Sequence, residues 1–491
     1  MYSRMHRSKI ISTNKNLPLS SFTASLGSVF WIVGGIAVVG TVAAVTLLSI
    51  GGIQLEIMFA VAAGLTLSLL PALLRTSRHD GDLFEISNLF ILLYALSSFS
   101  LPVSFLVSGE AGLDSSIDHI LPAVVLCTLG AVGFWMGYLS PQGGHLGKAF
   151  ALRMEYDDRG LFLVAWLFIG VGFVLMGFLI WFVGWSTYIN AISLEKHRLT
   201  LGLGQLFLGI NLIDLGIVLL FYRAFRQRGR WAFLLPSILL AGVIGFAFFC
   251  GMRRHILLPL MALLILYHYK IRPIRFRTLA IPSLVILPIF LTFGYYRGIL
   301  TEDLDEIKLH FLEHASWTWL DPGRSYFGAP FSNLTRILSE VPRSIPYVYG
   351  LTYLQTIVVI LPSSLYPDRP LSPAEWFSRE FYPNEYYAGG ARGFFVVTEA
   401  YWNFGLFGVP VVLFVIGLFL RALYVICIKE RSIFGIIMYG FCAPWPILAL
   451  IVIGFSAAVK LGLIHIFFVL LSAFLLRKMP VSSNIPRQIP R

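Results

Sequence analysis

Arginines and carboxylates gather in the stretch 297–394, the only long hydrophilic segment between apolar runs. From Arg297 to Arg392 it holds seven arginines and eleven of the 25 acidic residues of the chain. Guanidinium groups bind phosphate oxygens in a fork geometry and keep their charge beside lipid. A carboxylate can accept the proton of an attacking hydroxyl. These residue types together indicate chemistry on an anionic, phosphate-bearing substrate.

Several arginines are candidates for holding such an anion. They are Arg198, Arg253, Arg254, Arg297, Arg324, Arg336 and Arg392. Arg253 and Arg254 stand first, as candidate catalytic residues, because GMRRH is a very short connection between apolar runs. A charge at membrane level usually has a partner or a ligand. The alternative is an ordinary surface arginine, or an ion pair with one of the neighbouring carboxylates.

Glu399 is the candidate general base. It lies in TEAYWNFG, at the start of an apolar run, where an ionisable residue is a functional candidate by default. A structural bond to a tyrosine or a helix cap is the alternative. Tyr401 and Asn403 follow it as candidate substrate-binding residues. Rivals for the base are His314 and Asp321, whereas Asp214, the other buried acid, is expected to have a structural partner.

Metal chemistry is not expected. His310, Glu313 and His314 form H-x-x-E-H, a pattern that also occurs in zinc peptidases, but the acids before them indicate a solvated helix face. Asp303 and Asp305 form a D-x-D that chance explains. We therefore expect no metal and no cofactor, and without a phosphate-cradling G-x-x-x-x-G-K-[ST] we expect no ATP motor. The many Trp and Tyr of the loop either stack on sugars or anchor the chain at a membrane interface, and both interpretations stay open.

Composition sets the class of protein. Hydrophobic residues make up 57% of the 491, charged residues 13%, and the mean hydropathy is +0.79. Runs of about 20 apolar residues recur, the length that a helix needs to cross a bilayer. We expect an all-α polytopic membrane protein. The net charge of +12 does not indicate a nucleic-acid partner, because the basic residues mark one side of the membrane.

The apolar runs predict about twelve transmembrane helices. They are 26–50, 53–74, 83–107, 117–139, 161–183, 205–222, 231–250, 255–269, 278–296, 395–420, 433–455 and 460–476. Lys and Arg concentrate in alternate connections, which places both termini in the cytoplasm. The predicted organisation is a cytoplasmic tail 1–25, nine spans in 26–296, an extracytoplasmic loop 297–394, three spans in 395–476 and a cytoplasmic tail 477–491.

Two helices are expected inside the loop. Apolar residues at helical spacing in 304–320 predict an amphipathic helix on the membrane surface. The apolar stretch 347–361 is bounded by prolines and is short for a span, so we expect a re-entrant or interfacial helix.

Three stretches resemble the O-antigen polymerase (Wzy-type) family of oligosaccharide repeat-unit polymerases. They are GMRRHILLPLMALLILYHY, LPSSLYPDRPLSP and the loop exit GGARGFFVVTEAYWNFGLFGV, in which Glu399 precedes Asn403, Phe404 and Gly405. The likeness covers roughly 251–425, and the first five spans match only in topology.

This resemblance implies a metal-independent glycosyltransferase of the bacterial inner membrane. It would polymerise undecaprenyl-pyrophosphate-linked repeat units into a surface polysaccharide (O-antigen, capsule or exopolysaccharide) on the extracytoplasmic face. Arginines would bind the carrier pyrophosphate and Glu399 would deprotonate the acceptor hydroxyl. The implied partners are the lipid-linked glycan, the bilayer, and a chain-length regulator and flippase of the same pathway.

Two alternatives stay open. An O-antigen ligase-like transferase uses the same type of donor with a lipid A-core acceptor, and its products, not its sequence, distinguish it. A lipid-linked glycan transporter or flippase without chemistry would carry pathway charges through mid-membrane and often repeat symmetry. Here the polar residues lie on one face.

Overall fold

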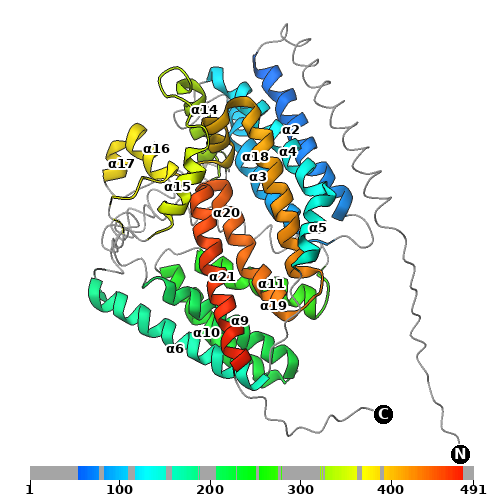
Figure 1. Cartoon of the computed structure of the whole chain (residues 1–491), viewed down its shortest axis with the longest axis vertical. Helices are drawn as coiled ribbons and strands as arrows, with labels where there is room; N and C mark the ends of the chain where they lie inside the picture. Colours follow the sequence, from blue (N-terminus) through cyan, green and yellow to red (C-terminus); the bar gives the residue numbers. More distant parts are fainter. Residues whose placement is uncertain are drawn as a thin grey trace, which may run out of the picture.

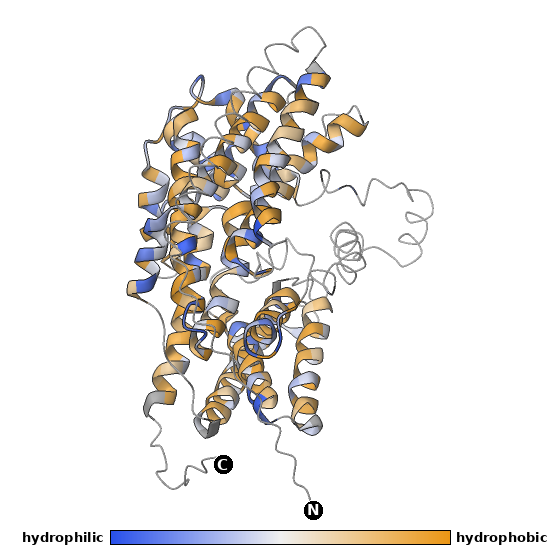
Figure 2. Ribbon diagram, turned by 90° about the vertical axis from the view of Figure 1, so that its right-hand side faces the viewer, coloured by the Kyte–Doolittle hydropathy of each residue, from blue (hydrophilic) through white to orange (hydrophobic). Residues whose placement is uncertain are grey.

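The computed structural model describes most of the chain. The described residues are 53–76, 82–108, 117–150, 158–185, 187, 206–227, 229–249, 254–274, 278, 321, 323, 327–361, 366, 368–387 and 392–478. Helices and turns make up this part of the chain (Figure 1), and most of the helical residues are apolar (Figure 2).

Apolar helices dominate the described part. They are α2 (Ile53–Thr76), α3 (Ile86–Ser108), α4 (Ile120–Leu139), α6 (Asp158–Val183), α9 (Leu208–Gln227), α10 (Leu234–Phe249), α11 (Arg254–Lys270), α18 (Val396–Ile428), α19 (Ile433–Cys442), α20 (Pro444–Val452) and α21 (Phe455–Lys478). The other elements are η1 (Ile117–His119), α5 (Pro141–Ala149), η2 (Arg230–Phe233), α14 (Ala329–Glu340), α15 (Leu351–Val359), α16 (Pro373–Phe381) and α17 (Pro383–Tyr387).

Nine segments of the described chain are long and apolar enough to cross a membrane, with α19 and α20 counted together. This confirms a polytopic helical membrane protein. The predicted span 26–50 and, apart from residue 278, the predicted span 278–296 lie outside the described residues, and His255–Lys270 forms a shorter apolar helix. The count of twelve therefore stays a prediction. Observed bounds differ at the ends: α18 continues to Ile428 and α21 begins at Phe455.

A seam of small residues joins α4 and α5 to α18. A side chain at Gly133 or Gly137 of α4 would overlap the backbone of Pro410 or Phe414, and one at Gly147 of α5 would lie 2.6 Å from the Cβ of Val425. Because glycine lets two backbones approach, the helices pack closely without polar groups, as membrane helices commonly do. The straight run of α4 and α5 beside α18 is visible in Figure 1.

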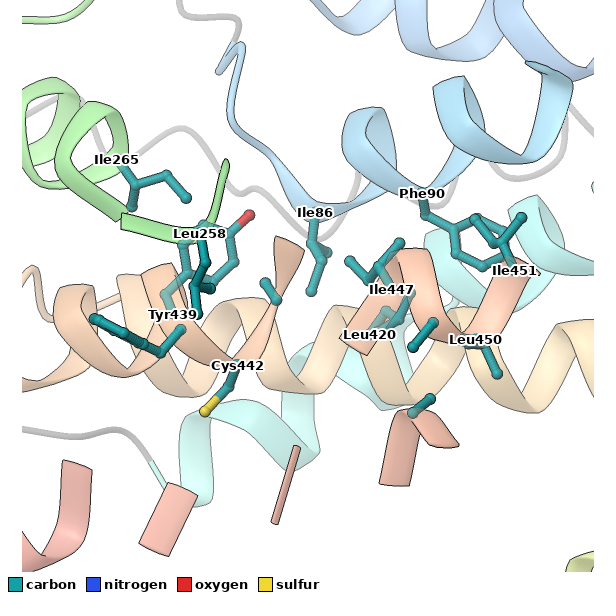
Figure 3. Packing of buried hydrophobic residues seen from close by; sticks show 14 of the residues in the cluster. Ile86, Phe90, Leu258, Ile265, Leu420, Tyr439, Cys442, Ile447, Leu450 and Ile451 are labelled. Atoms are coloured by element: carbon teal, nitrogen blue, oxygen red, sulfur yellow. The ribbon is translucent and has the colours of Figure 1, made fainter. Parts of the chain in front are cut away.

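The last three helices, α19 to α21, join this group to α6, α9 and α11 through one continuous core. In Figure 3, Ile86 and Phe90 of α3 face Ile447 and Ile451 of α20. In the same view, residues of α11 lie beside Tyr439 of α19. The core therefore fixes the start of α21 relative to α18, which matters for the site described below.

Helix α18 is broken near its start. Gly405 has φ 68° and ψ −157°, a conformation that few residues other than glycine adopt. The break gives the carbonyls just before it new partners outside the helix. The carbonyl of Trp402 accepts a hydrogen bond from the N–H of Val348 at 3.2 Å, and the carbonyl of Asn403 accepts one from the N–H of Tyr349 at 3.1 Å. Irregular backbone is thereby satisfied by protein, as it must be at membrane level.

A polar cluster at Asp82 and Glu85 marks one end of the helices. Glu85 accepts bonds from Arg75 of α2 at 2.5 Å, Tyr138 of α4 at 2.8 Å and Arg421 of α18 at 3.0 Å. These donors stand near the C-terminal ends of their helices, whereas Glu399 lies in the first turn of α18. Glu85 and Glu399 are therefore at opposite ends of the bundle. Which end faces the cytoplasm stays a prediction.

The predicted loop contains α14 to α17. Helix α15 covers nine residues of the predicted 347–361 helix and exposes Leu351, Leu354 and Ile357 along one face. The helix predicted over 304–320 lies outside the described residues. A second, smaller core around Phe377 and Phe394 holds this segment on the start of α18.

Candidate functional site

Glu399 is fully buried and joins three helices. Its Oε1 accepts the hydroxyl of Thr352 from α15 at 2.9 Å, and its Oε2 accepts the backbone N–H of Phe455, the first residue of α21, at 3.0 Å. The negative charge of Glu399 is favourable here, because the carboxylate lies at the N-terminal ends of both α18 and α21 and each helix end carries a partial positive charge. Each carboxylate oxygen has a second lone pair, so further donors fit the chemistry.

Asn403 lies one turn after Glu399 on α18 and is also buried. Its Nδ2 donates to Thr352 Oγ1 and to the carbonyl of Glu399, both at 2.8 Å, and its Oδ1 accepts the N–H of Gly350 at 2.8 Å. Gly350 has φ 87°, so this turn depends on glycine. Asn403 thus holds the beginning of α15 against α18 and fixes the hydroxyl that binds Glu399.

Tyr353 completes this cluster. Its ring meets Phe455 edge-on at 5.1 Å, and its buried hydroxyl has no hydrogen-bond partner among the residues that the structure describes. Burial, and then the charge of Glu399, raise the pKa of Tyr353 well above its usual range. The phenol therefore keeps its proton and can donate it to a ligand oxygen.

Two cations lie beside the same helices, and the sequence did not single them out as site residues. Arg369 donates to the carbonyl of Val359, the last residue of α15, at 2.5 Å and pairs with Glu375 at 3.4 Å. Lys460, in the second turn of α21, is close enough to feel the charges of Arg369 and Glu375. Within the described chain Lys460 makes no ion pair, so its charge is available to an anion.

A sequence signal for this pair existed. Arg369 lies in LPSSLYPDRPLSP, one of the three stretches that carry the family resemblance, and Lys460 is an isolated charge in a long apolar run. A charge in such a place is expensive and usually functional. What the sequence did not contain was their proximity, because 90 residues separate them.

Arg336 and Arg392 each form an ion pair with a neighbouring carboxylate, which is the alternative role that the sequence analysis left open. Arg392 binds Glu385 through two bonds, at 3.0 and 2.6 Å, and stacks 3.4 Å above the ring centre of Tyr382. Arg336 lies 3.7 Å from Glu340. Tyr401 donates to the carbonyl of Val341 at 3.2 Å. These three residues support the loop in this structure, and none of them contacts Glu399.

The remaining predicted arginines cannot be compared with this geometry. Arg198, Arg253, Arg297 and Arg324 lie outside the described residues, as does the side chain of Arg254, whose backbone begins α11. The same holds for Asp303, Asp305, His310, Glu313 and His314. Among the residues that are described, no group of three possible metal ligands comes together.

The aromatic residues of the loop that are described mostly contact one another. Trp376 stacks on Trp402 with ring centres 4.2 Å apart, and Phe394 meets Trp402 edge-on. These three rings form part of the small core under the loop, whereas Tyr349 and Tyr387 are exposed. Of the two rivals for the base, Asp321 accepts a hydrogen bond from the hydroxyl of Ser104, and His314 lies outside the described residues. Asp214 has the structural partner that the sequence predicted, because it lies 2.9 Å from His255.

Comparison of the chain with models of protein families, with curated proteins and with solved structures found no match. The candidate site therefore stands on its geometry: a buried acid with a hydroxyl donor, an unpaired phenol, and two cations around the starts and ends of α15, α18 and α21. This set can accept a proton and bind an anion within one region.

Proposed function

We propose that the chain is a membrane glycosyltransferase that polymerises undecaprenyl-pyrophosphate-linked oligosaccharide repeat units. The observation that supports it is the pairing of a proton acceptor with cations around α15. Glu399 lies on one side of this helix and Arg369 binds its last carbonyl. A transfer from a pyrophosphate leaving group needs these two functions together.

The reaction follows from these roles. The hydroxyl oxygen of the acceptor sugar attacks the anomeric carbon of the donor, and its proton passes to the Glu399 carboxylate. The bond from that carbon to the carrier pyrophosphate breaks, and the pyrophosphate leaves with the electron pair. Arg369 and Lys460 bind its oxygens, while Arg253 and Arg254 remain the candidates from sequence for the same charge. No metal is needed for this charge balance.

Thr352 indicates how an acceptor would bind. Its hydroxyl donates to Glu399 in the structure, which is the contact that the base must make with the acceptor hydroxyl. On this proposal the acceptor hydroxyl replaces Thr352 at Oε1, and the phenol of Tyr353 donates to a neighbouring sugar oxygen. Burial of Glu399 keeps competing water away.

The test uses purified protein in detergent with a synthetic undecaprenyl-pyrophosphate oligosaccharide, with and without EDTA. We expect a ladder of products that survives EDTA. Glu399→Gln keeps one oxygen for its partners but accepts no proton, so we expect it to fold and to lose about 100-fold or more in rate. Thermal unfolding serves as the control for folding.

Three outcomes would contradict parts of this proposal. Full activity of Glu399→Gln rules out the base, and loss of the ladder with EDTA rules out metal independence. No ladder in a preparation that binds the lipid contradicts polymerisation. In that case transfer of the glycan to a lipid A-core acceptor would identify a ligase-like enzyme. If no transfer to that acceptor occurred either, a transporter would be favoured.

A further inference from the structure

A cleft with basic walls lies at the opposite end of the bundle from Glu399. It is lined by Lys148 of α5, by Arg421, Tyr424, Val425 and Ile428 of α18, and by Lys429 and Arg431 of the following turn, and its volume is about 320 Å³. Four of these seven residues are cations, and none of the seven is an acid. The cleft belongs to the end of the bundle that carries Asp82 and Glu85, because Arg421 binds Glu85 there.

The charges of the cleft are only partly neutralised. Arg421 is paired with Glu85 at 3.0 Å, and Lys429 lies 3.7 Å from Glu430 on the surface. Within the described part of the chain, Lys148 and Arg431 make no ion pair. The cleft therefore keeps a positive field that an anion can balance.

The turn that carries Arg431 is strained. Arg431 has φ 47°, a left-handed conformation that is uncommon for any residue other than glycine. The bond from its N–H to the carbonyl of Ile428, at 3.0 Å, holds the tight turn. Strain of this kind is retained where the surroundings or a function require it. Here the turn places a cation, Arg431, on the wall of the cleft.

We propose that this cleft binds the phosphate group of an anionic phospholipid. The cleft lies where the apolar helix α18 ends, at Ile428, which is the level of the lipid headgroups. Its apolar residues, Val425 and Ile428, suit the glycerol and the first carbons of an acyl chain. Basic pockets between membrane helices bind lipid headgroups in this manner. The site is independent of the proposed transferase activity.

The test measures lipid retention by native mass spectrometry of the full chain, with phosphatidylglycerol and phosphatidylcholine as probes. The variant Lys148→Gln/Arg431→Asn removes both unpaired cations, and asparagine tolerates the left-handed conformation. Lys270→Gln/Arg272→Gln is the control, because it removes two charges near Tyr269, at the same end of the bundle but outside the cleft. Thermal unfolding in pure detergent checks that both variants fold.

We expect the wild type and the control to prefer phosphatidylglycerol, and the cleft variant to lose roughly thirtyfold in affinity, at roughly fivefold per cation. Equal loss in both variants would overturn the proposal in favour of general surface charge. Equal retention of the two lipids by the wild type would also overturn it. Displacement of the lipid by equimolar glycerol phosphate would assign the cleft to a soluble phosphate instead.

Discussion

The carboxylate of Glu399 accepts the backbone N–H of Phe455 at 3.0 Å, so the candidate base on α18 is also bound to the start of α21. Its other oxygen holds Thr352 of α15. One acid thus contributes to the fold and, on our proposal, to the chemistry. Substitutions around it have to be measured for stability and for activity separately.

Thr352→Val separates the two contributions. Valine has the shape of threonine but leaves Glu399 and the Asn403 amide each without one buried partner, so we expect the free energy of unfolding to fall by about 1–3 kcal/mol. Because the acceptor hydroxyl replaces Thr352 on our proposal, polymerisation should persist at temperatures where the variant is folded. Thr352→Ser is the matched control. A folded but inactive Thr352→Val would show that the threonine hydroxyl itself takes part.

Lys460→Gln and Arg369→Gln test the binding of the carrier pyrophosphate. A charged hydrogen bond to a phosphate contributes about 1.5–3 kcal/mol, so each variant should lose roughly tenfold to a hundredfold in kcat/KM for the lipid-linked donor. The rate is measured against donor concentration. Arg379→Gln changes an exposed arginine of α16 in the same loop and should match the wild type. If Arg379→Gln loses as much kcat/KM as the other two variants, the loss reflects the overall positive charge of this region and not specific binding of the pyrophosphate.

Gly137→Ala tests the seam between α4 and α18. The new methyl group would overlap the carbonyl of Phe414, and overpacking of this kind costs about 1–3 kcal/mol. Gly170→Ala in α6 is the matched control, because nothing lies within 4 Å of the position where its methyl group would stand. Unfolding in detergent should show a loss only for Gly137→Ala. Equal stability of the two variants would contradict close packing at this seam.

The hydrogen bonds around Asp82 predict that the free energy of unfolding falls in acid. Burial raises the pKa of Asp82, but hydrogen bonds from His268, Tyr269 and Tyr424 and the charge of His268 outweigh it, so the pKa lies below its usual value. Its stabilising contribution is therefore present above the ordinary aspartate pKa of about 3.9 and is lost as the pH falls through the lower folded value. Asp82→Asn should be less stable than the wild type at neutral pH. The difference should shrink below about pH 4, and a difference independent of pH would contradict this assignment.

Composition and periodicity determined the class of protein. Runs of apolar residues long enough to cross a bilayer leave few alternatives to helices, because backbone groups inside lipid must bond within their own segment. Most described spans therefore lie within a few residues of their predicted bounds, although α18 continues to Ile428. Glu399 and Asn403 were chosen as candidates from the sequence, since polar residues at the start of an apolar run are conspicuous, and their functional roles stay predictions.

Only the tertiary structure decided which polar residues meet. Arg369 and Lys460 are far apart in the chain, and no periodicity links a loop arginine to a lysine of the last helix. Arg336 and Arg392 were sequence candidates for the carrier phosphates after Arg253 and Arg254, yet each has a neighbouring carboxylate in the fold. The acids Asp82 and Glu85 join helix ends for the same reason. Helix packing brings these residues together, and the distances that it sets are not written in the local pattern of any one segment.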